Sequence, residues 1–147
     1  MRKMLTIVAT VAALCVGATA FSPAVRAGTG RPMSGSAEGA ITGAPAPGVL
    51  TVDTAGTATH LGNFTRHETI TFTSATTFVG ELAFVAANGD ELDADFSGEF
   101  DGPGHAVGTY TFTGGTGRFS DATGTATFAA STDGVNVSVT FTGTIDY

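Results

Sequence analysis

Two charged residues on an otherwise apolar stretch are the strongest chemical feature of this sequence. Arg66 and Glu68 share the even-numbered parity of Phe64, Ile70 and Phe72, which places all five side chains on one face of a β-strand. The phenylalanine face is the one expected to be buried. Two charges in an apolar interior are stable only as a pair or against a ligand. In that position they would form a polar anchor, or an acid–base group, for a molecule held inside the fold.

Two other arrangements of Arg66 and Glu68 are compatible with the same pattern. A shift of strand register by one residue would turn both side chains to the solvent face. A position at the rim of the fold would leave them hydrated. The sequence leaves these alternatives open.

The same alternation collects aromatic residues on the predicted inner face along the rest of the chain. These rings either pack as a solid core or line a cavity for an apolar ligand, and small alanine and glycine partners leave room for the second arrangement. With Arg66 and Glu68, the candidate ligand-binding residues are Phe72, Phe84, Phe96, Tyr110, Phe112 and Phe128.

Other chemical signals are weak. Asp93 and Asp95 imitate the start of a calcium-binding loop, but Gly104 occupies the twelfth position, where a glutamate is needed. Strand alternation explains this acidic run as a solvated face. The three histidines lack metal-ligand spacing, and the sequence has neither a serine nucleophile elbow nor a phosphate-binding loop. We therefore predict no metal site and no cofactor.

The first 27 residues have the features of a secretory signal peptide. Arg2 and Lys3 precede an apolar run over residues 4–20, and small-residue cleavage sites end at Ala20 and Ala27. We predict a secreted protein with one domain over residues 28–147, of which 28–35 form a loose lead. The single cysteine, Cys15, falls in the signal, so the domain must be stable without disulfides.

Charge restricts the partners of that domain. Removing Arg2, Lys3 and Arg26 takes the formal net charge from −7 to −10 and leaves no lysine. Phosphate-rich partners require clustered Lys and Arg. We therefore predict no nucleic-acid partner and, after signal cleavage, no membrane partner.

Turn residues fix two hairpins in the predicted all-β domain. The loop over residues 87–89 ends in Gly89 and pairs Phe84 with Leu92, which also sets a glycine opposite each of two rings, at Gly80–Phe96 and Phe78–Gly98. A two-residue turn at Asp133-Gly134 pairs Ala130 with Val137 and Phe128 with Val139, while residues 44–48 break the chain between two early strands. About eight short strands without a covering helix predict a small antiparallel barrel.

The segment Gly114-Gly115-Thr116-Gly117-Arg118-Phe119-Ser120-Asp121-Ala122-Thr123-Gly124 resembles the glycine-rich signature of the dirigent and allene oxide cyclase barrel superfamily, in particular its small exported bacterial members. The resemblance covers about residues 50–147. It implies an eight-stranded antiparallel barrel with an apolar cavity, frequent trimers, and cyclisation or radical coupling of hydrophobic substrates in some members. The residues assigned to the structural loop are Gly114, Gly115, Gly117, Arg118, Phe119 and Gly124.

Within this loop, glycines permit tight backbone between two strands, Phe119 is expected to tuck back as a plug, and Arg118 to pair with Asp121. The functional prediction is a secreted barrel that binds a hydrophobic small molecule. A cyclase or isomerase that guides ring closure in the cavity, and an inert structural scaffold, are the alternatives. No catalytic residue of the family can be matched to this chain, so no catalytic residue is assigned.

Overall fold

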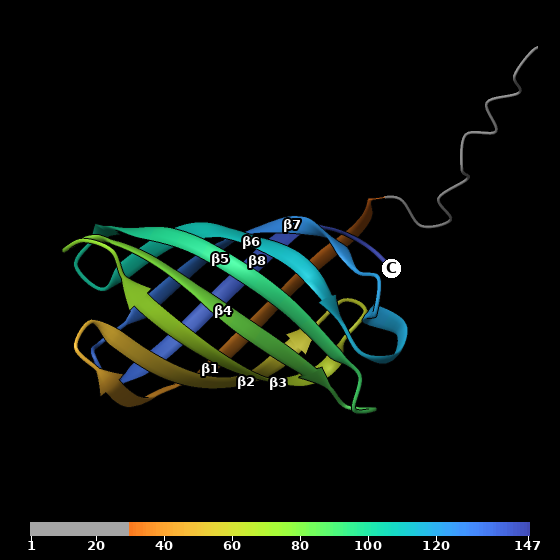
Figure 1. Ribbon diagram of the computed structural model, residues 1–147, viewed down its shortest axis with the longest axis horizontal. Helices are drawn as coiled ribbons and strands as arrows, with labels where there is room; N and C mark the ends of the chain where they lie inside the picture. Colours follow the sequence, from red (N-terminus) through yellow and green to blue (C-terminus); the bar gives the residue numbers. More distant parts are fainter. Residues whose placement is uncertain (1–29) are drawn as a thin grey trace, which may run out of the picture.

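The computed structural model describes residues 30–147, which form a closed barrel of eight antiparallel strands (Figure 1). Each strand pairs with its sequence neighbours, and β8 closes the barrel against β1. This confirms the predicted fold class. The predicted signal peptide lies outside the described residues. The strands are β1 (Arg31–Ala46), β2 (Val49–Ala58), β3 (Gly62–Phe72), β4 (Thr77–Ala86), β5 (Glu91–Gly102), β6 (His105–Gly115), β7 (Thr123–Thr132) and β8 (Asn136–Asp146), with a 3-10 turn, η1 (Gly117–Phe119), between β6 and β7.

Up-and-down connectivity gives the barrel two different ends. The connections over residues 47–48, 73–76, 103–104 and 133–135 lie at one end, which we call the open end. The connections over residues 59–61, 87–90 and 116–122 lie at the other, which we call the closed end (right in Figure 1), together with residues 30 and 147. Within residues 30–147 no helix has the length and hydropathy needed to span a membrane.

The β4–β5 hairpin has the predicted register. Phe84 pairs with Leu92, Gly80 with Phe96, and Phe78 with Gly98. The Ala86 amide donates to the Asp90 carbonyl at 2.8 Å, which closes the three-residue loop. Turn chemistry and hydrophobic alternation specify the same pairing here, so the register could be read from the sequence.

The predicted register of the β7–β8 hairpin is wrong by two residues. Ala130 pairs with Val139 and Phe128 with Phe141, because four residues, 133–136, rather than two separate the last paired residues of the hairpin. The carboxylate of Asp133 accepts hydrogen bonds from the amides of Val135 at 2.9 Å and Asn136 at 2.7 Å. This side-chain capping stabilises a wider turn than the Asp-Gly pair indicates. A shift of two residues preserves the inward face, so the same side chains still enter the core.

The predicted loose lead over residues 28–35 is also wrong in part. Strand β1 begins at Arg31, and its pairing with β8 starts at Arg31–Ile145. The connection between β1 and β2 is shorter than the predicted break over residues 44–48, because β1 continues to Ala46, with register shifts on either side of Gly43. A barrel must pair its first strand with its last, and this requirement orders residues whose local sequence reads as a loop.

The glycine-rich segment plugs the closed end. Phe119 is fully buried and packs on Tyr147, with ring centroids 5.0 Å apart, as expected for a plug. The predicted Arg118–Asp121 pair is not formed. Arg118 instead donates to the carbonyl of His60 at 2.6 Å and lies 3.5 Å from the Asp90 carboxylate. Because Gly117 has a φ of +57° and a Cβ there would lie 2.1 Å from Asp90 Oδ1, only glycine lets the loop close over this carboxylate.

Two glycines make room for the rings that face them across the sheet. A Cβ on Gly80 would lie 2.3 Å from Cζ of Phe96, and one on Gly98 would lie 2.7 Å from Cζ of Phe78. The ends of these rings therefore occupy the space that a side chain at each glycine would need, which lets large side chains fill a narrow barrel. This was the arrangement predicted from the hairpin register.

We expect Gly80→Ala to destabilise the barrel by about 1–3 kcal/mol, because the new methyl group overlaps the Phe96 ring and the Thr69 carbonyl. The measurement is the free energy of unfolding in urea. Gly102→Ala is the matched control, since a Cβ there meets nothing within 4 Å. Equal stability of the two variants would contradict this role for Gly80.

Candidate ligand site in the barrel

The interior divides into a solid half and a hollow half along the barrel axis. Toward the closed end, Phe84 packs against Phe64 and Phe141, with ring centroids 5.1 and 5.5 Å apart, and Phe112 is buried in the same core. Two predicted cavity residues, Phe84 and Phe112, therefore belong to the packed core and do not line the cavity. Both residues point inward like the cavity residues, but they lie nearer the closed end. Alternation predicts which face a side chain occupies and does not predict its position along the barrel axis.

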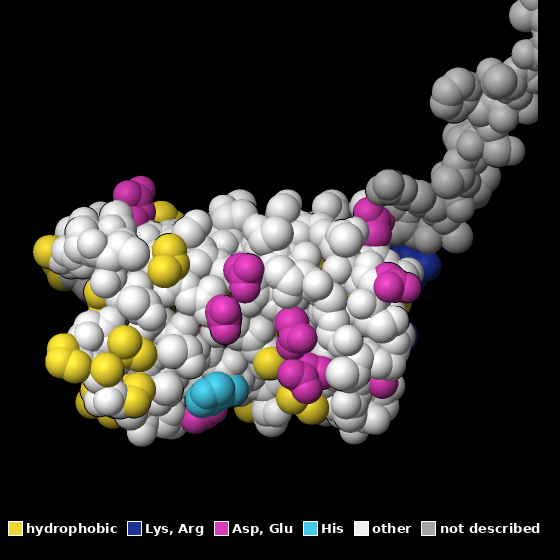
Figure 2. Space-filling model, in the orientation of Figure 1, with side chains coloured by type: hydrophobic (Ala, Val, Ile, Leu, Met, Phe, Trp, Pro, Cys, Tyr) yellow, Lys and Arg dark blue, Asp and Glu magenta, His cyan; other side chains and the backbone are white. Residues whose placement is uncertain are grey.

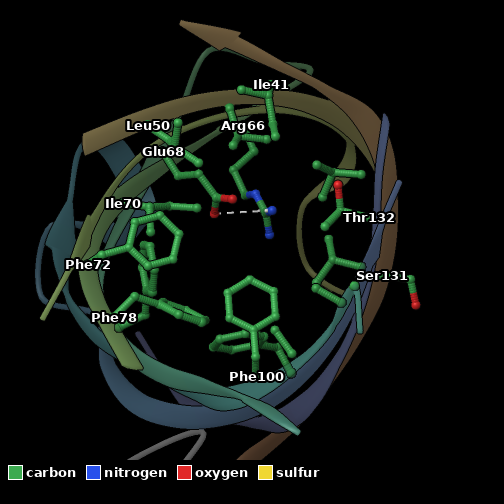
Figure 3. A pocket seen from close by; sticks show the side chains of 18 of the residues that line it. Ile41, Leu50, Arg66, Glu68, Ile70, Phe72, Phe78, Phe100, Ser131 and Thr132 are labelled. Carbon is green, nitrogen blue, oxygen red and sulfur yellow. Dashed lines mark ion pairs between the residues drawn. The ribbon is translucent and has the colours of Figure 1, made fainter. Parts of the chain in front are cut away.

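A cavity occupies the half toward the open end (Figure 3). Its volume is about 80 Å³. Six of the eight predicted ligand-binding residues line it: Arg66, Glu68, Phe72, Phe96, Tyr110 and Phe128. Its remaining wall is mostly aliphatic and aromatic, including Ile41, Leu50, Val52, Ile70, Phe78 and Phe100.

Arg66, Glu68 and Tyr110 form a buried polar network in this apolar wall. Arg66 is 2% and Glu68 6% exposed, so neither the register-shift nor the rim alternative applies. Nη2 of Arg66 lies 3.2 Å from Oε2 of Glu68, and Nη1 donates to the Tyr110 hydroxyl at 2.8 Å. Strand β3 supplies both charges at positions i and i+2 on its inner face, and β6 supplies the tyrosine from across the lumen.

Burial changes the proton affinity of this network. Removal from water raises the pKa of the Glu68 carboxyl above its usual value, and the neighbouring Arg66 guanidinium opposes this rise. Burial likewise raises the pKa of Tyr110 to about 12. The tyrosine therefore stays a neutral hydroxyl at ordinary pH, and the carboxyl is able to hold a proton more readily than an exposed glutamate.

The network leaves two buried polar atoms without partners. Nε of Arg66 and Oγ1 of Thr54 are buried and accept or donate no hydrogen bond within the described residues. Thr54 pairs with Arg66 across β2 and β3. Thr54 was not among the predicted site residues, although it shares the inward parity of Val52, which is also buried. Unsatisfied buried groups are costly and rare in folded proteins, so each calls for a physical explanation such as a bound partner.

The open end presents an apolar rim around the cavity mouth. Figure 2 shows hydrophobic side chains gathered at this end and the basic side chains at the closed end. Val135 in the β7–β8 connection is 63% exposed, and Phe72 and Phe100 are half-buried where β3 and β5 end. An apolar ligand approaching from this side therefore meets an apolar entrance.

Two histidine–aspartate pairs lie outside the barrel, away from the cavity. Nδ1 of His67 lies 2.6 Å from Oδ1 of Asp53, and His105 pairs in the same way with Asp101. All four side chains are well exposed, so these contacts contribute little to stability. Within residues 30–147, no three His, Cys, Asp or Glu side chains gather in a geometry that could hold a metal ion.

We expect Arg66→Leu to destabilise the protein by about 3–5 kcal/mol, since it leaves Glu68 buried without its partner. The double variant Arg66→Leu/Glu68→Leu should lie within about 1 kcal/mol of the unsubstituted protein, because it removes both charges. Urea unfolding measures both. A double variant as unstable as the single variant would show that the ion pair holds the fold together.

The raised pKa of Glu68 predicts a pH dependence of stability. Its folded-state pKa exceeds the unfolded value of 4.5, so its contribution is fully present below about pH 4.5 and is lost as pH rises through the folded pKa. Relative to Glu68→Gln, the unsubstituted protein should lose unfolding free energy as the pH rises above about 4.5. Parallel stability profiles for the two proteins would show that burial of this carboxyl has no such cost.

Comparison with known proteins agrees with this architecture. No family model and no curated protein matches the sequence. Among solved structures, the chain is similar to a pterocarpan synthase dirigent protein, with a TM-score of 0.50 and 16% sequence identity over 79% of this chain and 84% of that chain. At this identity the likeness concerns the fold alone. The described residues therefore form a dirigent-like, closed eight-stranded barrel.

Proposed function

We propose that the protein is a secreted carrier that binds a small hydrophobic molecule in its barrel. The observation that carries this proposal is the cavity itself, which is apolar, opens at one end and contains a buried Arg66–Glu68–Tyr110 network with an unpaired donor. Ligand sites in proteins combine mostly apolar walls with a few polar groups that fix orientation. An inert scaffold would gain stability from filling this space and would lose little from replacing both charges with apolar side chains.

The dimensions of the cavity limit what it encloses. A cavity needs about 10–15 Å³ to hold one water molecule, so the 80 Å³ of this cavity accommodates several waters or one small ring. Cavities that enclose drug-sized ligands reach about 300–1,000 Å³. The barrel therefore encloses either a small molecule or one end of a larger molecule that projects through the mouth.

Ring closure of a hydrophobic substrate is the second candidate function. Its specific support is Glu68, a carboxyl with a raised pKa that faces the apolar cavity beside Arg66 and Tyr110. Such a group can donate a proton to a reacting oxygen. This role requires Glu68→Gln to abolish turnover while ligand binding persists, whereas a carrier requires binding alone.

Export and assembly belong to the same proposal. Secretion rests on the signal-like residues 1–27, and assembly as a trimer rests on the family resemblance. The acidic, lysine-free domain disfavours nucleic acid and anionic membranes as partners. Chemical analysis of protein purified from culture medium would identify any molecule it carries.

Toluene is a suitable probe of the cavity, and we expect it to raise the melting temperature in a concentration-dependent manner. Ala130→Leu should abolish this rise, because Ala130 lines the cavity and a leucine would fill it. Ala129→Leu is the matched control, since Ala129 belongs to the outer face of the same strand. Absence of a toluene effect on the unsubstituted protein, or an equal effect on both variants, would refute binding inside the barrel.

A further inference from the structure

The hydrogen-bonding capacity of Arg66 exceeds what its neighbours satisfy. A guanidinium carries five N–H donors and no acceptor. In this structure one bond goes to the Tyr110 hydroxyl and one contact to the Glu68 carboxylate, while Nε is buried and unpaired. The Tyr110 oxygen is the acceptor in its bond, so its own proton is available to a further partner. Besides the Glu68 carboxylate, which is itself an acceptor, the patch therefore has several N–H and O–H donors that no neighbour accepts.

The charges of the patch are already balanced. With Glu68 ionised, Arg66 and Glu68 lie 3.2 Å apart as a pair without net charge, and the rest of the cavity lining is uncharged. A ligand carboxylate would bring a second negative charge next to Glu68, and a ligand cation would bring a second positive charge next to Arg66. Both would be buried with unfavourable neighbours. A neutral ligand avoids this conflict.

From these observations we infer that the cavity selects a neutral molecule whose polar group is a hydrogen-bond-accepting oxygen, such as a carbonyl or an ether, which Arg66 binds. This inference rests on the proposed binding function and specifies its ligand class. Aromatic rings of Phe72, Phe96 and Phe128 pack around the rest of the molecule. The enclosed volume limits the part held next to Arg66 to about one ring.

Three one-ring probes of nearly the same shape separate the alternatives. Acetophenone carries a neutral acceptor, α-methylstyrene replaces its oxygen with a CH₂ group, and benzoate carries an anionic acceptor. Titrations followed by NMR chemical shifts give the dissociation constant of each for the purified protein. We expect acetophenone to bind about tenfold or more tightly than α-methylstyrene, because a hydrogen bond to a charged donor is gained. Benzoate should bind more weakly than acetophenone.

Variants connect this preference to the network. In Arg66→Leu/Glu68→Leu, which removes the pair without leaving an isolated charge, the preference for acetophenone over α-methylstyrene should disappear. Tyr110→Phe retains the guanidinium and should reduce the preference by less. Ala129→Leu, on the outer face, should leave all three constants unchanged.

The outcomes distinguish the ligand class from the function. Equal affinities for acetophenone and α-methylstyrene would overturn the acceptor class while binding in the barrel stands. Benzoate binding as tightly as acetophenone would overturn the neutral class. No binding of any of the three probes would overturn the proposed function, and this inference with it.

Discussion

Closure of the sheet is the constraint on which the rest of this molecule depends. Once β8 pairs with β1, every second side chain points into one lumen of fixed width. With eight strands this lumen has room only for side chains or for one small ligand. Large rings fit because glycines face them, as at Gly80 and Gly98. Toward the closed end the rings and Phe119 fill the lumen, and toward the open end they leave a cavity. The boundary between core and site is therefore set by packing volume.

The charged network is intelligible only within that lumen. Arg66 and Glu68 would be unremarkable on a surface, where an ion pair contributes little. Inside the barrel they must satisfy one another, and their geometry satisfies only part of the guanidinium. Replacement by apolar side chains would remove the cost of burying the charges. An incompletely paired charged group buried beside an apolar cavity is the main physical support for the proposed ligand.

The β4–β5 register could be predicted because two independent signals, alternation and turn type, agreed. Alternation alone indicated the inward position of Arg66 and Glu68, and it left a register shift or a rim position open. Prediction failed where a single local signal was misleading. The Asp133 side chain widened the β7–β8 turn, and pairing across the closure ordered residues from Arg31 onward. Depth along the barrel axis could not be read either, so Phe84 and Phe112 were placed in the cavity rather than in the core.

The plugged end restricts how a ligand could enter and leave the barrel. Since Phe119 and its neighbours close one end, a bound ligand would have to leave through the mouth by which it entered. Two ligands cannot pass each other in a barrel that is open at one end only. A bound ligand would therefore have to dissociate before a second ligand could enter. Residence time would then be governed by the side chains at the mouth. Residues 30 and 147 lie at the closed end, so a group attached to either of them would not block the cavity mouth.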